Sequence, residues 1–374
     1  MRQPKTNRSY DVVIVGAGAA GVGCGVVLKE LGLEHFTILE RHQVGASFSR
    51  WPEEMNFITP SFPSHGFGLL DLNAVTLMTS PAIAFRREHI SGKHYALYLQ
   101  TIADHFDLPI QTGVEVQTVE PLSQGGFKLH TSAGDLRSQF VIWAAGEYQY
   151  PRLNPFPGAE HCLHNTQIRS WADLEGDELI IIGGYESGMD AAANLVSLGK
   201  KVGVLDRTGA WADPGTDPSV ALSPFTLQRL DSVYRTGRLA MVDNASIEEV
   251  KPIPGGYAVY SEYEKWVTAH PPILCTGFDT SLKQIAPLFD WSEGYAALTE
   301  NDESTITPGL FVSGPSVRHG DLIFCFIYKF RQRFAVIANA IAYRLQLDST
   351  PLEKYRQAGL FLDDLSCCGN DCIC

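Results

Sequence analysis

Short apolar runs followed by glycine turns and apolar helical stretches recur along the chain, which is the pattern of an α/β protein. The stretch YDVVIVGAGAAGVGCGVVLKELGL predicts a buried strand, a tight turn and a helix, and HFTILE predicts the next strand. A second stretch, DELIIIGGYESGMDAAANLVSLGKKVGVLDR, repeats this order of elements. The chain therefore predicts two Rossmann-like units of three layers each.

The first glycine turn has the spacing of a dinucleotide-binding fingerprint. Gly16 permits the tight turn, Gly18 lets a pyrophosphate approach the backbone, and Gly21 lets the helix pack on the strand. Glu40, at the end of the next strand, is placed to bind a ribose hydroxyl. The predicted nucleotide site comprises Gly16, Gly18, Ala19, Ala20, Gly21, Glu40 and Arg41.

The second turn departs from the fingerprint at its middle glycine, where Tyr185 stands. Tyr185 could close over a nucleotide or weaken the approach of its phosphates, so a domain that no longer binds nucleotide remains the alternative. Asp206 favours the free 2′-hydroxyl of NADH, while Arg207 could pair with the 2′-phosphate of NADPH. The predicted site comprises Gly183, Gly184, Tyr185, Glu186, Ser187, Asp206 and Arg207.

Three further strands end in small-residue turns. FVIWAAGEY ends at Gly146, PPILCTGF at Gly277 and TPGLFVSGP at Gly314. A long apolar helix is expected near residues 321–345.

With these motifs in this order, nearly the whole chain resembles the flavoproteins with two dinucleotide folds, which include pyridine-nucleotide disulfide reductases and flavin monooxygenases. The resemblance implies FAD on the first fingerprint and NADPH or NADH on the second. The segment FSRW resembles a flavin-proximal segment of such proteins. By resemblance, the positions near the flavin or at the domain crossings are Ser49, Trp51, Ala145, Gly146, Gly277 and Gly314.

The resemblance implies an FAD domain in two parts, residues 1–155 and 280–366, with an NAD(P) domain inserted at 156–279. Only sixty residues follow Gly314, so we expect no separate dimerisation domain. This architecture looks like the thioredoxin-reductase type, and the second fingerprint is most similar to the bacillithiol-disulfide-reductase group. That group has a cysteine where this chain has Ala20, so its reactive thiol cannot be transferred.

The cysteine pairs of the resembled reductases are missing. The segment before the second fingerprint supplies only Cys162, and no cysteine pair follows Glu40. A monooxygenase-like mark, FPGAEHCLHNTQI, has the wrong spacing to His164, which we expect to cap or pack the domain crossing. The scattered thiols are interpreted as reduced core or near-surface residues: Cys24, Cys162, Cys275 and Cys325.

Half of the eight cysteines lie in the terminal segment 367–374. We expect this segment to be a flexible tail, which at ~3.3 Å per residue could reach about 25 Å. The tail could shuttle electrons by thiol-disulfide exchange, could relay a soft metal ion, or could have no role. Its spacing does not match a structural zinc site. The candidate catalytic thiols are Cys367, Cys368, Cys372 and Cys374.

The formal net charge of −13 argues against nucleic acid and anionic membrane surfaces as partners. The polar N-terminus lacks the apolar stretch of a signal peptide, so we expect a cytoplasmic protein. A homodimer is compatible with the sequence. The predicted function is an FAD-dependent NAD(P)H oxidoreductase that reduces a small-molecule or small-protein disulfide, or a soft metal ion. The alternatives are a flavin monooxygenase and a non-catalytic flavin or nucleotide sensor with a metal-binding tail.

Overall fold

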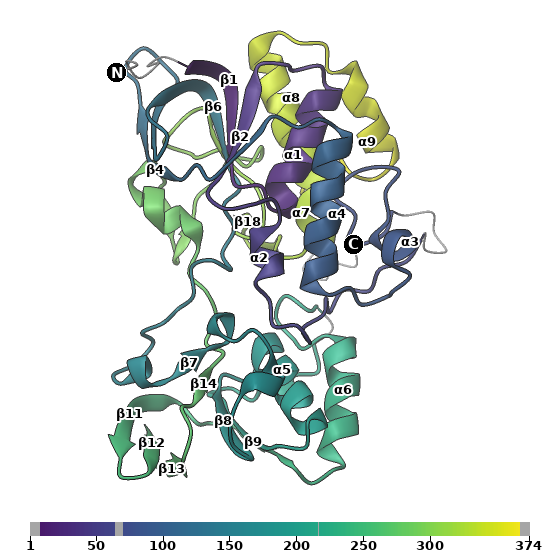
Figure 1. Ribbon diagram of the computed structural model, residues 1–374. Coiled ribbons are helices and arrows are strands. Elements are labelled where there is room, and N and C mark those ends of the chain that lie inside the picture. The colour runs from purple at the N-terminus through teal and green to yellow at the C-terminus, as the bar shows by residue number, and fades with distance from the viewer. Residues whose placement is uncertain (1–7, 64–69, 216, 367–374) are drawn as a thin grey trace, which may run out of the picture.

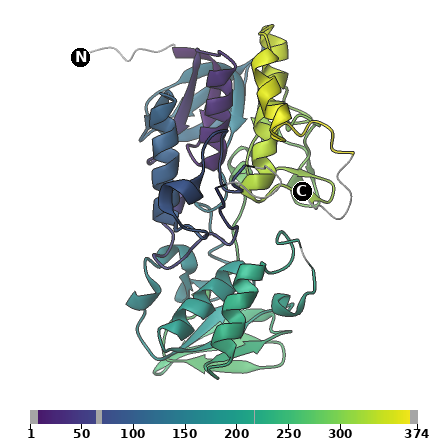
Figure 2. The same ribbon diagram turned by 90° about the vertical axis from the view of Figure 1, so that its right-hand side faces the viewer.

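The computed structural model describes residues 8–63, 70–215 and 217–366. The chain forms two lobes, each built around its own sheet (Figures 1 and 2). The tail cysteines predicted to be catalytic lie outside the described residues.

The upper lobe in Figure 1 contains a seven-stranded sheet in the order β3-β2-β1-β6-β5-β4, with β17 paired to β6. Strand β6 belongs to two neighbourhoods, because its first half pairs with β5 and its second half with β17. Strands β1, β2, β3, β6 and β17 run parallel, while β4 and β5 are antiparallel. The strands are β1 (Arg8–Val15), β2 (Phe36–Glu40), β3 (Ile110–Thr112), β4 (Val116–Pro121), β5 (Phe127–Thr131), β6 (Leu136–Trp143) and β17 (Leu310–Val312).

Helices α1, α4 and α8 lie together beside this sheet (Figure 1). Apolar side chains fill the space between the helices and the strands, and the central strand β1 buries Val12, Val13 and Ile14 completely. The helices of this lobe are α1 (Ala19–Glu30), α2 (Ala46–Ser49), α3 (Pro81–Phe85), α4 (Gly92–His105), α7 (Ile327–Phe330), α8 (Phe334–Leu345) and α9 (Glu353–Gln357). Its short strand pairs are β15 (Trp291–Ser292) with β16 (Tyr295–Ala296), and β18 (Arg318–His319) with β19 (Leu322–Ile323).

The lower lobe has a parallel five-stranded sheet in the order β10-β9-β8-β14-β7, with helices and a three-stranded antiparallel sheet packed around it (Figure 1). Its parallel strands are β7 (Leu163–His164), β8 (Glu178–Ile182), β9 (Lys201–Leu205), β10 (Leu239–Val242) and β14 (Ile273–Leu274). Its other elements are α5 (Glu186–Ser197), α6 (Pro224–Tyr234), β11 (Ile247–Ile253), β12 (Gly256–Ser261) and β13 (Lys265–Thr268).

The chain crosses from the upper lobe to the lower after β6 and returns after β14, so the lower lobe is inserted in the upper one. The two crossing segments pair with each other: the N–H of Arg152 donates to Gly277, and the N–H of Asp279 donates to Tyr150. The predicted fold class, two Rossmann-like α/β domains with the second inserted, is confirmed. The residue boundaries assigned to these domains stay a prediction. Among the described residues, no helix has the length and hydropathy needed to cross a membrane.

A buried ion pair joins the start of α8 to the segment that precedes β17. Arg333, which is fully buried, donates from Nε and Nη2 to the two carboxylate oxygens of Asp302, both at 2.9 Å. Its remaining N–H groups bond the carbonyl oxygens of Glu300 and Leu362. One side chain therefore joins the start of α8 to two other segments, residues 300–302 and the chain at Leu362.

We predict that Arg333→Met lowers the stability of the upper lobe by about 3–5 kcal/mol, because it leaves the Asp302 carboxylate buried without its main counter-charge. The measurement is the urea midpoint of the upper lobe's unfolding transition. Arg235→Met is the control, since Arg235 forms an exposed pair with Asp231, and such a pair contributes at most about 1 kcal/mol. Equal midpoints for the two variants would contradict the prediction.

Candidate functional site

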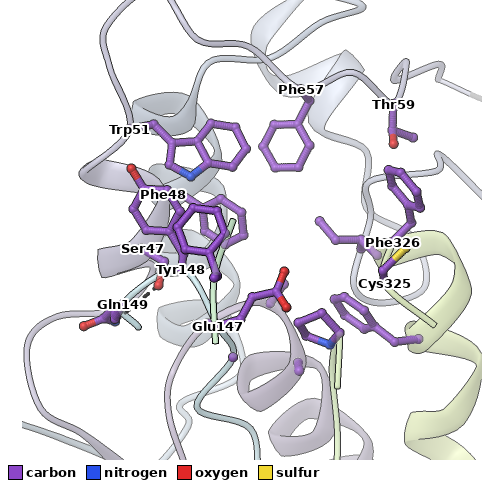
Figure 3. A pocket seen from close by; sticks show the side chains of 18 of the residues that line it. Ser47, Phe48, Trp51, Phe57, Thr59, Glu147, Tyr148, Gln149, Cys325 and Phe326 are labelled. Atoms are coloured by element: carbon purple, nitrogen blue, oxygen red, sulfur yellow. Dashed lines mark hydrogen bonds between the residues drawn. The ribbon is translucent and has the colours of Figure 1, made fainter. Parts of the chain in front are cut away.

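A cavity of about 370 Å³ lies between the lobes, and residues of both lobes line it (Figure 3). Its wall is mainly aromatic and aliphatic. The turn after β1, the turn after β6 and the start of α5 all open onto this space. Predicted site residues on the wall are Gly16, Gly18, Ala19, Ala20, Glu40, Trp51, Ala145, Gly146, Glu186 and Ser187.

The first fingerprint packs as its glycines predict. A Cβ on Gly21 would lie 1.8 Å from the carbonyl oxygen of Gly16, and one on Gly16 would lie 2.6 Å from that of Ala144. Both positions must therefore be glycine for α1 to start against the strands. Gly18 differs, because a Cβ there would meet nothing within 4 Å. It leaves open space before the N-terminus of α1, where free N–H groups favour a phosphate.

Glu40 ends β2 with its side chain buried at the wall of the cavity. The N–H groups of Ala17 and His42 donate to its two carboxylate oxygens, each at 2.8 Å. These bonds fix the carboxylate beside the glycine turn and leave lone pairs for the hydroxyls of a ribose. Its neighbour Arg41 does not line the cavity, but donates to Gln149 and stacks over Tyr150.

The FSRW segment brings some of its predicted residues to the cavity. Trp51 reaches the wall, where it packs against Phe48 and Phe57. Ser49 does not, since its hydroxyl donates to Ala46 within the single turn of α2. Ser47 lines the cavity instead.

The crossing glycines have different roles. Gly146 lines the cavity, whereas Gly277 uses its carbonyl oxygen to pair the crossing segments. His164 lies within 3.3 Å of that carbonyl through Nε2 and caps the short turn that follows it, as the sequence predicts. Burial lowers the pKa of His164.

Gly314 lies beside Ala20: a Cβ added to Gly314 would lie 3.3 Å from the Cβ of Ala20.

In the second fingerprint, Gly183 and Gly188 repeat the packing roles of Gly16 and Gly21. Tyr185 occupies the N-cap of α5, as Gly18 does for α1. Its hydroxyl donates to the carbonyl oxygen of Pro218 at 2.7 Å and lies 3.0 Å from that of Ala221. The Tyr185 ring is thus tied to segment 217–221.

Asp206 is held by backbone donors. The N–H groups of Gly184, Thr208 and Gly209 lie 2.7–2.8 Å from its carboxylate oxygens. Burial opposes its ionisation, but these hydrogen bonds outweigh burial and lower the pKa of Asp206. Asp206 therefore shapes the turn, and Arg207 beside it is exposed.

Several polar residues on the wall are not among those predicted from the sequence, and they include Glu147, Asn165 and Cys325. Figure 3 shows the Glu147 carboxylate directed into the open centre, and burial raises the pKa of Glu147. Glu147 follows the AAG turn directly, so its position in the motif was an available signal. Asn165 and Cys325 carried none, because only the fold brings them to the cavity.

The other three body cysteines fit the interpretation as core or near-surface thiols. Cys24 and Cys275 are buried and Cys162 is half-buried, and burial raises the pKa of all three. Within the described ranges no two cysteines are paired, and no cluster of three or more His, Cys, Asp or Glu could hold a metal ion.

Residues 13–314 match the sequence profile of the pyridine nucleotide-disulphide oxidoreductase family. The chain belongs to this family. The bacilliredoxin reductase Bdr of Bacillus subtilis (strain 168) is 23% identical over 308 residues, which are 81% of this chain and 88% of that protein.

Solved structures share the fold. The bacillithiol disulfide reductase Bdr (YpdA) from Staphylococcus aureus has a TM-score of 0.75 at 19% identity, covering 90% of this chain and 99% of that one. A flavin-containing monooxygenase from Stenotrophomonas maltophilia has a TM-score of 0.69 at 18% identity, with 90% and 99% covered.

As a member of this family the chain is an FAD-dependent oxidoreductase that uses NAD(P)H. The residues present fit FAD. The open space at Gly18 and the start of α1 suits a pyrophosphate, and the fixed Glu40 carboxylate suits a ribose.

We predict that Gly18→Trp abolishes FAD binding while the fold persists, because the indole would fill the space intended for the pyrophosphate. The flavin absorbance per protein and the far-ultraviolet circular dichroism test the two halves of the prediction. Gly203→Trp is the matched control, since a Cβ on Gly203 also meets nothing within 4 Å and Gly203 does not line the cavity. Normal flavin content in Gly18→Trp would contradict the assignment.

Proposed function

We propose that this oxidoreductase passes electrons from NAD(P)H through FAD to a disulfide, either a small molecule or part of a small protein. The observation that carries the proposal is the shared cavity: Gly18 and Glu40 of the first fingerprint and Glu186 and Ser187 of the second line the same space. Two cofactors bound at these positions would meet there. The disulfide acceptor is supported by the similarity to reductases whose names specify bacilliredoxin and bacillithiol disulfide.

The chain's own contribution is binding, orientation and exclusion of water. FAD supplies the chemistry of accepting a hydride from the nicotinamide and releasing two electrons to an acceptor. The starts of α1 and α5 present N–H groups to phosphates. Hydrogen bonds from Ser223 and Thr226 hold the Glu186 carboxylate in position. The aromatic side chains of Phe48, Trp51 and Phe57 keep water away from the reacting centre.

The terminal thiols are proposed as the relay between flavin and acceptor. The four cysteines of the described body do not form a pair, whereas Cys367, Cys368, Cys372 and Cys374 follow directly on its last residue, Ser366. Thiolates in the tail would exchange with a disulfide or capture a soft metal ion. A cytoplasmic location is part of this proposal, because that compartment keeps such thiols reduced.

We predict that Asp206→Ala and Arg207→Ala shift cofactor preference in opposite directions. Loss of the Asp206 charge removes repulsion of a 2′-phosphate and should raise the NADPH-to-NADH ratio of kcat/KM by about tenfold, or ~1.4 kcal/mol. Loss of Arg207 should lower that ratio. The ratio is the proper measure because Asp206 also holds the turn, which affects both cofactors equally.

Arg235→Ala, which removes an exposed arginine beside α6, is the control for a change in charge alone. A ratio that moves the same way in both test variants would contradict this assignment.

We predict that truncation after Ser366 leaves FAD content and reduction of the flavin by NAD(P)H nearly unchanged. Turnover with the physiological disulfide or metal acceptor should fall by at least about tenfold, or ~1.4 kcal/mol of transition-state stabilisation. Steady-state oxidation of NAD(P)H measures the effect.

A full-length variant with serine at all four tail cysteines is the matched control for chain length. If it turns over as slowly as the truncated protein, the thiols are responsible. Full activity of the truncated protein with every disulfide and metal acceptor tested would show that the tail has no relay function.

A flavin monooxygenase is the second candidate function, favoured by the apolar aromatic wall, which would hold an organic substrate out of water. The two functions differ in their need for oxygen. Anaerobic oxidation of NAD(P)H with a disulfide as the only acceptor supports the reductase, whereas strict dependence on oxygen with an oxygenated product supports the monooxygenase. A protein that binds its cofactors and does neither would act as a sensor.

A further inference from the structure

The thiol of Cys325 lies at the joint between the two lobes, on the segment that leads from β19 into α7. Its Sγ donates to the hydroxyl oxygen of Ser219, in the lower lobe, at 3.2 Å. Lys329, one helical turn further on, donates to the same hydroxyl at 2.8 Å and to Asp217 Oδ1 at 2.9 Å. Contacts with the other lobe therefore fix where this thiol lies.

Of the four cysteines in the described ranges, Cys325 is the one on the wall of the cavity. Cys24 is 1% exposed, and its thiol donates a hydrogen bond to the hydroxyl oxygen of Ser313. Cys275 lies in the core behind the second fingerprint, where Gly183 packs on its carbonyl group. Cys162 is half-buried and packs against the apolar cluster that contains Val250 of β11. A ligand in the cavity can thus meet one body thiol.

A second observation points to a ligand in the same cavity. Asn165 is 1% exposed and lines the wall, yet neither Nδ2 nor Oδ1 has a hydrogen-bond partner in the described chain. A buried polar atom left without a partner costs about 1–3 kcal/mol, so such a group calls for a bound partner. An amide that both donates and accepts suits the polar atoms of an organic molecule.

Glu147 adds an acid–base group to this wall. Its carboxylate is directed into the centre of the cavity (Figure 3), and no hydrogen bond or ion pair from the described residues reaches it. The charge of Glu147 acts to raise the pKa of Cys325. A thiol, a free carboxyl group and a free amide therefore share one apolar cavity.

We propose that Cys325 is the body thiol that attacks a small disulfide bound in this cavity, with Glu147 as its proton acceptor and Asn165 as a binding group for the disulfide's substituents. This inference rests on the proposed function, because it takes a disulfide as the acceptor. The acceptor in this inference is a free small disulfide.

The first step exchanges one disulfide for another. The Cys325 thiol gives its proton to the Glu147 carboxylate, and its sulfur attacks one sulfur of the acceptor R–S–S–R. A Cys325–S–S–R bond forms, the acceptor's S–S bond breaks, and the leaving thiolate takes the proton back from Glu147 to become R–SH. No electrons are gained or lost in this step.

The second step consumes the reductant. NAD(P)H would supply two electrons by way of FAD. With these electrons and two protons, one from the transferred hydride and one from solvent, the Cys325–S–S–R bond would be reduced. The products are the Cys325 thiol and a second R–SH. The sum is one NAD(P)H and one proton for each disulfide converted to two thiols.

The expected protonation states of Cys325 and Glu147 are consistent with a thiol and its proton acceptor. Burial raises the pKa of Cys325, and the charges of Glu147 and Asp217 act in the same direction, whereas the Ser219 hydrogen bond and Lys329 act to lower it. The thiol is therefore not ionised by itself at neutral pH. Such a thiol needs a base to become a nucleophile. Burial also raises the pKa of Glu147, which makes its carboxylate a stronger base than an exposed one.

The experiment treats the oxidised holoprotein with dithiodipyridine, a small, uncharged aromatic disulfide, without NAD(P)H. Acid quenching and peptide mass spectrometry then follow the mixed disulfide at each cysteine over time. We expect Cys325 to be modified at least about tenfold faster than Cys162, which is a half-buried thiol outside the cavity. In Glu147→Gln, the rate at Cys325 should fall by about tenfold while flavin absorbance is unchanged.

Turnover provides the second readout. Cys325→Ser should lower NAD(P)H-driven reduction of dithiodipyridine by at least about tenfold, and Cys162→Ser should leave it unchanged. Ser219→Ala removes the hydrogen bond to the thiol but keeps the sulfur, so it should still form the adduct at Cys325. If Ser219→Ala loses turnover as Cys325→Ser does while the wild-type Cys325 is never modified, the cysteine is structural and the inference is overturned.

The two proposals fail in different ways. Modification of Cys325 at no more than the Cys162 rate, with NAD(P)H-driven disulfide reduction intact, overturns the role of Cys325 and leaves the proposed function standing. Absence of any disulfide reduction by the wild-type holoprotein overturns the proposed function, and with it this inference.

Discussion

The site depends on one constraint, which is the close approach of each central helix to the strand that precedes it. A Cβ on Gly21 would lie 1.8 Å from the Gly16 carbonyl oxygen, and a Cβ on Gly188 would lie 1.9 Å from that of Gly183. With no side chain there, α1 and α5 begin directly at the carboxyl ends of β1 and β8. Their free N–H groups then face one shared cavity, which is where an anionic cofactor is stabilised.

The two lobes use this common geometry differently. In the upper lobe, Gly18 keeps the approach to α1 open. In the lower lobe, Tyr185 takes the same place and sends its hydroxyl to segment 217–221. That segment also carries Asp217 and Ser219, which bind the buried Lys329 of α7. Gly18 thus leaves this position open in the first fingerprint. In the second fingerprint, the side chain of Tyr185 links the same position to the segment that contacts the upper lobe.

The joint also decides which groups face the cavity. Lys329 is a buried charge, and such a charge is tolerated only with a well-placed partner. Its partner Asp217 comes from the other lobe, so the packing of the lobes and the position of the neighbouring Cys325 are linked. A change in the angle between the lobes would move the thiol, the Lys329 pair and the Tyr185 anchor together.

The sequence by itself determined the features that local physical chemistry dictates. Tight turns require glycine, buried strands require apolar runs and a ribose site requires an acid after the second strand, so Gly16, Gly21 and Glu40 could be predicted. The insertion of one domain in another was predicted only through the family resemblance, and the order of the strands agrees with it. The tertiary structure alone decided which side chains line the cavity. It brought Ser47 rather than Ser49 to the wall. It also joined Glu147, Asn165 and Cys325 there, because contacts between residues this far apart in the chain arise only when the lobes pack.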